Sequence, residues 1–230
     1  MTGTVMFTDL RSFTAFAETT PAERVIDVLN RYLGDMGGAV LDHGGTLVAY
    51  TGDGLLAAFG APIPSEDHAD RAVAAAGVMI RERLPAFNLW LAAEGLCDGF
   101  RMGIGVNTGP VMSGNVGSER RVEYTVMGDT VNTASRIESL TKEAPYPVLV
   151  ADETPSAMGS PPAEYYGGSS TKTSRRPATG LRAGGLLPAD PYVLGRQARA
   201  ERAPGPLRRY VGGPGRRDAA RGGGARCPDR

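Results

Sequence analysis

The hydrophobic positions along the first 155 residues alternate between the spacing of strands and that of helices. A run of mostly apolar residues over about 2 to 9 predicts a strand, and a short helix is expected to begin near Arg11. From Pro21 toward Val40 the apolar positions recur at helical spacing, and Pro21 suits the first turn of such a helix. Two short apolar runs flank a Gly-Asp-Gly turn within 46–59, which is a strong signal for a β-hairpin.

The later part of this region continues the same alternation. An alanine-rich helix is expected from about Glu66 to Leu84, and a strand over 100–106 follows it. A loop and a strand then lead to a helix near Asn132, and an apolar strand is expected near 147–151. This order predicts an α+β fold, with a mainly antiparallel sheet and helices on one face.

Two aspartates lie where predicted strands end. Asp9 follows the first apolar run, and Asp53 lies in the hairpin turn. If the first strand is antiparallel to the hairpin, the two carboxylates converge within coordination distance. Hard oxygen ligands select Mg²⁺ or Mn²⁺, and two such ions can clamp an in-line displacement at phosphorus. The alternative is that Asp9 caps a helix and Asp53 only completes a turn.

A third segment, 121–140, combines a strand, a Gly-Asp-Thr break and an amphipathic helix. Asn132 and Arg136 are four residues apart in this helix, so they share one face. An amide beside a guanidinium suits a sugar oxygen and a phosphate, because the guanidinium fork matches phosphate oxygens. The alternative is a solvated polar face that binds no ligand.

Three separated stretches carry these residues: VMFTDLRSFTAF at 5–16, GGTLVAYTGDGLLAAFGAP at 44–62, and MGIGVNTGPVMSGNVGSERRVEYTVMGDTVNTASRIESLTK at 102–142. In their order and spacing they resemble the class III nucleotidyl cyclases, the catalytic domains of adenylate and guanylate cyclases. The resemblance extends over about residues 2 to 153. It implies the ferredoxin-like core of that family for a catalytic domain at 1–155.

The resemblance implies a metal site and a triphosphate site in the first two stretches. Asp9 and Asp53 match the metal-binding aspartates, and the backbone carbonyl of Leu10 matches a further ligand, for two Mg²⁺ or Mn²⁺ ions per active site. The amides of the turn after Leu10 would hold the triphosphate of the substrate, as helix N-termini hold anions. That turn consists of Arg11, Ser12, Phe13 and Thr14.

The same resemblance assigns residues to the nucleoside and the reacting phosphate. Thr125 falls at a base-recognition position, Asn132 at the position that orients the ribose, and Arg136 at the position that stabilises the charged transition state. Ala49 departs from the pattern, because most active members have there a lysine that hydrogen-bonds the purine edge. Guanine recognition usually places a glutamate at that position, and Thr125 can accept a hydrogen bond from an exocyclic amine. ATP is therefore the expected substrate.

The implied reaction is intramolecular: the ribose 3′-hydroxyl attacks the α-phosphorus and leaves a 3′,5′-cyclic monophosphate plus pyrophosphate. In the family one protomer supplies the metal pair and the other supplies the base, ribose and transition-state residues. A homodimer with two shared sites is therefore expected. Two alternatives stay open. One is a pseudo-cyclase that binds nucleotide and acts as a regulatory partner, and the other is a metal-dependent phosphotransferase with another product.

Charge and composition divide the 230 residues into two parts. Residues 1–160 hold 11 Lys and Arg against 20 Asp and Glu, whereas 161–230 hold 14 against 5. The latter range also contains 13 Gly and 9 Pro without apolar periodicity, so 156–230 is expected to be a largely disordered basic tail. The two closing strands of the family, with their lysine-glycine turn, have no recognisable counterpart in it.

This tail has two interpretations. It is either a shifted reading frame of a GC-rich gene or a basic arm for nucleic acid or anionic lipid, although no specific nucleic acid is expected. Cys97 and Cys227 stand far apart in no metal or redox spacing, which favours a reducing cytoplasm. No apolar stretch approaches membrane-spanning length and no secretory signal opens the chain. A membrane tether or regulatory module would lie upstream of this sequence.

Overall fold

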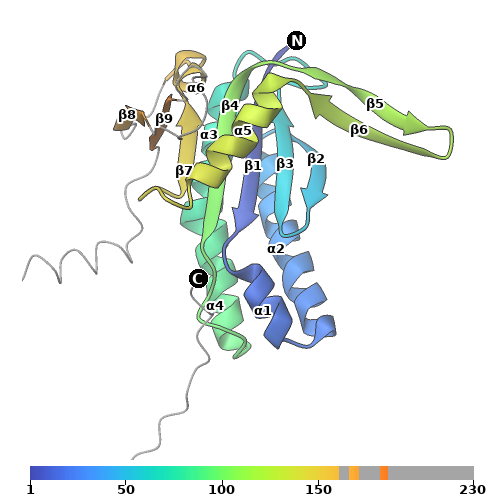
Figure 1. The fold of residues 1–230 in the computed structure, drawn as a ribbon, viewed down its shortest axis with the longest axis vertical. Coiled ribbons are helices and arrows are strands. Elements are labelled where there is room, and N and C mark those ends of the chain that lie inside the picture. The colour runs from blue at the N-terminus through green and yellow to red at the C-terminus, as the bar shows by residue number, and fades with distance from the viewer. Residues whose placement is uncertain (161–165, 171–181, 186–230) are drawn as a thin grey trace, which may run out of the picture.

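A mixed sheet of seven strands forms the centre of the computed structural model, which describes residues 1–160, 166–170 and 182–185 (Figure 1). The strands lie in the order β2-β3-β1-β4-β7-β9-β8, and among them the β4–β7 pair alone is parallel. Their bounds are β1 Thr2–Leu10, β2 Thr46–Thr51, β3 Gly54–Phe59, β4 Met102–Pro110, β7 Val148–Ala151, β8 Tyr166–Ser170 and β9 Arg182–Gly185. The predicted α+β class with a mainly antiparallel sheet is confirmed.

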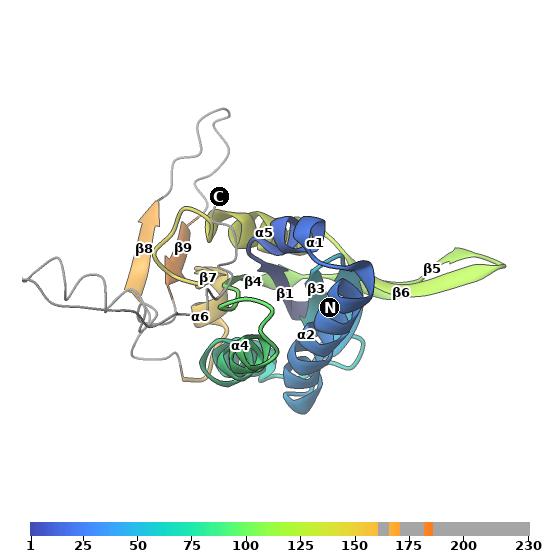
Figure 2. The ribbon, with the colours of Figure 1, turned by 90° about the horizontal axis from the view of Figure 1, so that it is seen from below.

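The helices lie on both faces of this sheet, where one face was expected. Figure 2 shows α2 and α4 on one side and α5 on the other, and α3 shares the apolar core of α2 and α4. The bounds are α1 Phe13–Thr19, α2 Ala22–Asp42, α3 His68–Val78, the π-helical turn η1 Met79–Arg83, α4 Leu84–Ala93, α5 Asp129–Leu140 and α6 Glu153–Ser156. In the described part of the chain no helix combines the length and the apolar character that a bilayer crossing requires.

Two apolar cores explain this arrangement, because the central strands are apolar on both sides. In β1, Met6 belongs to the large core under α2, α3 and α4, whereas its neighbour Val5 belongs to a smaller core that contains Ala134 of α5. Successive side chains of a strand point to opposite faces, so one strand contributes to both cores. Strand β3 is buried along its whole length for the same reason.

The helical region predicted over 66–84 reaches farther along the chain in the structure. It begins at His68, passes through the π-helical turn, and continues as α4 to Ala93. Pro85 lies in the first turn of α4, where its missing N–H and its ring disfavour a regular α-helical connection to the preceding turn. The π-helical turn η1, which is wider than an α-helical turn, lies directly before α4. Helical structure therefore continues beyond Leu84, where the pattern predicted the end of the helix.

A two-stranded arm projects away from the sheet (Figures 1 and 2). It consists of β5 (Met112–Ser118) and β6 (Arg121–Met127), paired antiparallel from Met112↔Met127 to Ser118↔Arg121. The sequence pattern predicted a loop and a strand before the helix near Asn132, and the structure has two paired strands there. Its large exposed apolar side chains are Met112, Val116, Val122 and Met127.

The predicted basic tail, 156–230, lies mostly outside the described residues. Within it, the backbone of β9 pairs antiparallel with β7, with Leu149 opposite Gly185, and β8 pairs with β9. These two strands extend the sheet at the position where the sequence pattern identified none. The division at 155–156 stays a prediction, since α6 spans that position.

Candidate active site

Asp9 and Asp53 come together at one end of β1, as the sequence predicted. Strand β1 pairs antiparallel with β3, with Thr8 opposite Leu55, so the last residues of β1 lie beside the β2–β3 turn that carries Asp53. Gly54 permits this approach, because a Cβ there would overlap the Thr8 carbonyl oxygen. The Leu55 amide also donates a hydrogen bond to the Thr8 hydroxyl at 3.2 Å.

The electrostatics of this pair favour a bound cation. Partial burial raises the pKa of Asp53, and the nearby negative charge of Asp9 raises that pKa further. A divalent ion between two carboxylates would offset this repulsion, and carboxylate oxygens are the ligands that Mg²⁺ and Mn²⁺ prefer. Within the described residues no group of three or more His, Cys, Asp or Glu could hold a metal. A cation held by these two carboxylates would need further oxygen ligands from outside the His, Cys, Asp and Glu side chains.

A buried phenol lies beneath this pair. Tyr32 of α2 is fully buried, and its hydroxyl makes no hydrogen bond. Burial raises its pKa well above the ordinary range, and the charges of Asp53 and Asp9 raise that pKa further. The Thr8 hydroxyl is close enough to lower that pKa, but its geometry is not that of a hydrogen bond. In the sequence, the helical spacing of Tyr32 predicts only a core position and no role at the site.

Arg11 connects the aspartate pair to helix α5. Its Nη1 donates to Asp9 Oδ2 at 2.8 Å, and its Nη2 donates to Glu138 Oε1 at 2.6 Å and to the Thr141 hydroxyl. Lys142 Nζ lies 3.8 Å from the same Asp9 oxygen. The Arg11 side chain therefore points to α5, a contact that the sequence analysis did not predict.

The sequence carries a signal for the burial of Glu138 and Thr141. With Ala134 and Ile137 they occupy positions that share one face of a helix, and all four are buried. A glutamate in an otherwise apolar stripe indicates a buried partner, because an unpaired buried carboxylate is costly. The sequence does not identify that partner.

The turn predicted to hold the triphosphate contains one core residue. Phe13 is buried against Phe16 and Phe100, so only its backbone can face a ligand, whereas Thr14 is exposed. Ser12 has a left-handed φ of 64°, which turns the chain sharply between β1 and α1. Leu10, whose carbonyl is the predicted third metal ligand, is itself buried at the end of β1.

The residues predicted to bind base, ribose and transition state lie on other elements. Thr125 is half-buried on β6, and Asn132 and Arg136 are both exposed on α5. Ala49 is exposed on β2. Within residues 1–160, no described hydrogen bond or ion pair joins Asn132 or Arg136 to either aspartate. One chain thus presents two separate groups of candidate residues.

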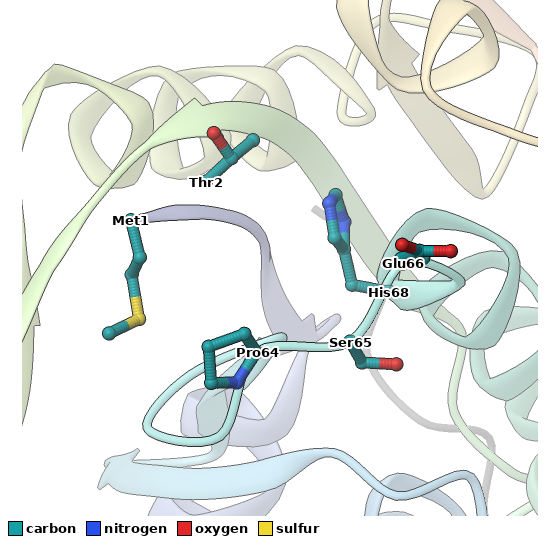
Figure 3. A pocket seen from close by; sticks show the side chains of 6 residues that line it. All are labelled: Met1, Thr2, Pro64, Ser65, Glu66 and His68. Atoms are coloured by element: carbon teal, nitrogen blue, oxygen red, sulfur yellow. The ribbon is translucent and has the colours of Figure 1, made fainter.

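A surface hollow of about 450 Å³ lies at the opposite end of β1 (Figure 3). It is lined by Met1, Thr2, Pro64, Ser65, Glu66 and His68. A strand rises about 3.3 Å per residue, so the hollow lies roughly 20 Å from Asp9. It is separate from the aspartate pair.

The fold and the paired aspartates define an α+β domain with a carboxylate site where a strand and a hairpin turn meet. Residues 2–176 match the adenylate and guanylate cyclase catalytic domain, so the chain belongs to this family, as its motifs indicated. It is 39% identical over 148 residues to adenylate cyclase 1 of Rhizobium meliloti (strain 1021), which covers 64% of this chain and 22% of that protein. It is 35% identical over 153 residues to adenylate cyclase of Anabaena cylindrica, which covers 65% of this chain and 29% of that protein.

Solved structures agree with this assignment. The guanylyl cyclase Cya2 superposes with a TM-score of 0.68 at 36% identity, over 84% of this chain and 95% of that chain. The adenylyl cyclase CyaB from P. aeruginosa superposes with a TM-score of 0.68 at 30% identity, over 83% of this chain and 95% of that chain. The chain spans less than a third of the two curated relatives named above.

Proposed function

We propose that this chain cyclises ATP to 3′,5′-cyclic AMP and pyrophosphate. The observation that carries the proposal is the convergence of Asp9 and Asp53, in a chain that belongs to the cyclase catalytic domain family. In this reaction the ribose O3′–Pα bond forms and the bond from Pα to the β-phosphate oxygen breaks. Pyrophosphate leaves with that electron pair, and the 3′-hydroxyl proton passes to solvent.

The residues at this end of β1 would hold the triphosphate and its cations. Two Mg²⁺ or Mn²⁺ ions, when bound, lower the pKa of the 3′-hydroxyl and neutralise charge on the phosphates. Asp9, Asp53 and the Leu10 carbonyl are the proposed ligands. The backbone amides of the turn from Arg11 to Thr14 are the proposed contacts of the triphosphate.

The candidate residues on β6 and α5 would complete the site from a second protomer. Asn132 would orient the ribose, and Arg136 would oppose negative charge that develops at the α-phosphate, a preorganised electrostatic effect. Both side chains are exposed, and so are the large apolar side chains of the β5–β6 arm. A homodimer would bring two such groups to two aspartate pairs.

Two positions bear on the choice of base. Thr125 is half-buried on β6 and can accept a hydrogen bond from the exocyclic amine of adenine. Ala49 offers no side-chain donor or acceptor, so it can recognise neither purine. We therefore infer ATP as the substrate, with weak discrimination against GTP.

Ala49 also supports a second candidate function. A chain that lacks one of the usual base contacts could bind nucleotide without turnover and act on a partner as a pseudo-cyclase. The positions for metal and transition state are all occupied by the residue types that the chemistry needs, which favours the enzyme. The two candidate functions predict different results for an intact dimer. The enzyme forms cyclic nucleotide, whereas the pseudo-cyclase binds nucleotide and forms no product.

The test is an assay of cyclic nucleotide and pyrophosphate from ATP or GTP, each with Mg²⁺ or Mn²⁺. Asp9→Ala and Arg136→Ala are the test variants, and Asp42→Asn is the control, because Asp42 forms an exposed ion pair with Arg83. Cyclic AMP that is abolished in both test variants and retained in the control would support the proposal. Bound nucleotide without product, in an intact dimer, would overturn it in favour of the pseudo-cyclase.

A further inference from the structure

The Arg11 guanidinium bridges two carboxylates on different elements. Nη1 donates to Asp9 Oδ2 at 2.8 Å, and Nη2 donates to Glu138 Oε1 at 2.6 Å. The Arg11 and Glu138 side chains are 15% and 10% exposed, so this ion pair is largely shielded from water. Arg11 and Glu138 are 127 residues apart in the sequence.

The sheet makes room for this bridge. A Cβ on Gly103 of β4 would overlap Arg11 Nη2 and the Thr141 hydroxyl, so the guanidinium occupies space that a larger residue would fill. The Thr141 hydroxyl donates to the Glu138 carbonyl at 2.6 Å and accepts from Nη2. The Arg11 amide donates to the Arg101 carbonyl at 2.8 Å. Both ends of the Arg11 residue are therefore held.

We propose that Arg11 is a positioning residue for Asp9 and that Glu138 sets how strongly Arg11 holds it. The contact with Nη1 uses Asp9 Oδ2 and leaves Oδ1 for a divalent cation. Glu138 contacts the guanidinium through Nη2, away from the aspartate pair. Because α5 also carries Asn132 and Arg136, the bridge joins the two proposed half-sites of one protomer. The inference rests on the proposed metal-binding role of Asp9.

The direction of the effect follows from the charges. One guanidinium charge is shared between two carboxylates, so Glu138 weakens the hold of Arg11 on Asp9. Replacing Glu138 by Gln keeps an oxygen that can accept from Nη2 but removes the competing charge. Arg11 then pairs more strongly with Asp9 and competes with the cation. Changes in residues that contact a metal ligand commonly lower metal affinity by about tenfold or more.

The test measures Mn²⁺ binding without turnover. Free Mn²⁺ is measured by electron paramagnetic resonance in the presence of 3′-deoxy-ATP, which lacks the attacking hydroxyl. Glu138→Gln is expected to bind Mn²⁺ roughly tenfold more weakly than the unchanged chain. Asp42→Asn, the same chemical change in the exposed ion pair with Arg83, is expected to leave Mn²⁺ affinity unchanged.

Arg11→Lys provides a second variant. Lysine keeps the positive charge but lacks the planar fork that divides it between the two carboxylates. An undivided lysine charge beside Asp9 competes with the cation as in Glu138→Gln, so weaker Mn²⁺ binding is expected here too. It also tests the inference if Glu138→Gln does not fold. A merely structural bridge would lower the thermal midpoint of the variants and leave Mn²⁺ affinity within twofold of the unchanged chain, and that result would overturn the proposal.

The Mn²⁺-binding test of this inference and the cyclase assay of the proposed function can fail independently. If the unchanged chain makes no cyclic nucleotide, but Glu138→Gln binds Mn²⁺ more weakly than the unchanged chain does, the cyclase assignment fails and the inference about Arg11 stands. If the unchanged chain forms cyclic AMP and neither variant changes Mn²⁺ affinity, the cyclase assignment stands and this inference fails. Absence of Mn²⁺ binding by the unchanged, folded chain would overturn the inference together with the metal ligands.

Discussion

At the scale of single residues, the buried polar groups around the aspartate pair differ in how well they are satisfied. Arg11 and Glu138 satisfy each other, whereas the Tyr32 hydroxyl is fully buried without a hydrogen bond. A buried polar group that lacks a partner lowers stability by its full desolvation cost, about 1–3 kcal/mol. Removal of the Tyr32 hydroxyl should therefore stabilise the fold.

We predict that Tyr32→Phe raises the free energy of unfolding by about 1 kcal/mol, because it removes the unpaired hydroxyl and keeps the ring. Chemical denaturation measures the change. Tyr50→Phe is the control, since Tyr50 is 51% exposed and its hydroxyl can reach water. A loss of stability in Tyr32→Phe would mean that the phenol has a partner in solution, such as water between it and the carboxylates.

A second residue-scale prediction concerns His68 at the far end of β1. Its Nδ1 lies 2.8 Å from the Thr4 hydroxyl, which in turn contacts the Thr108 hydroxyl at 2.7 Å. Burial lowers the pKa of His68, although the charges of Asp67 and Asp70 act in the opposite direction. The unfolded chain then binds a proton that the folded chain does not.

The free energy of unfolding should therefore fall as pH drops below about 6.5, the ordinary pKa of histidine. Above that pH the neutral ring contributes its full stability. Denaturation at pH 7.5, 6.5 and 5.5 should show a smaller fall in His68→Gln than in the unchanged chain, because glutamine does not titrate. Equal falls in both proteins would contradict the prediction.

At the scale of elements, the position of α5 depends on glycines in β4. A Cβ on Gly105 would overlap the backbone of α5 at the Glu138 nitrogen and the Ala134 oxygen. Helix and strand therefore pack with their backbones in close approach, which only glycine permits. The same helix presents Asn132 and Arg136, so this packing sets the place of one proposed half-site.

We predict that Gly105→Ala lowers the free energy of unfolding by more than about 2 kcal/mol, because backbone atoms of α5 cannot move away as a flexible side chain can. Thermal or chemical denaturation gives the value. Gly34→Ala in α2 is the control: a Cβ there meets nothing within 4 Å, and alanine should stabilise the helix by about 0.5–1 kcal/mol. Equal effects of the two changes would contradict the packing argument.

At the scale of the whole molecule, the two groups of proposed active-site residues lie on different elements of one chain. The aspartates lie at the end of β1 and in the β2–β3 turn, whereas Thr125, Asn132 and Arg136 lie on β6 and α5. The β5–β6 arm carries exposed apolar side chains away from the sheet (Figure 1). These features are what a shared site in a homodimer requires.

We predict that Asp9→Asn and Arg136→Ala, each inactive alone, recover activity when mixed. A mixed dimer would have one site with both changes and one site with neither. Random exchange at equal amounts should restore roughly a quarter of the unchanged activity. Val122→Asp in both chains places a charge on the exposed apolar arm and should abolish this recovery, with sedimentation showing monomers. No recovery from a mixture of demonstrated dimers would contradict shared sites.

The sequence by itself determined the features that depend on neighbours along the chain. Strand and helix periods, the Gly-Asp-Gly turn and the i, i+4 spacing of Asn132 and Arg136 are local, so their patterns predicted most elements of 1–155 and the place of both aspartates. The motifs also led to the family that the comparisons confirm. The extension of the third helix to Ala93 escaped prediction because Pro85 usually marks an end.

The tertiary structure alone decided which distant residues meet. The Arg11–Glu138 pair, the Tyr32 phenol beneath the aspartates, and the placement of α5 on the second face depend on how strands pair and on where glycines let backbones approach. Strand β9 joins the sheet through backbone pairing with β7, which no side-chain pattern revealed. Such contacts join positions that are far apart in the sequence. A local pattern shows that a residue is buried or polar, but only the packed chain determines its partner.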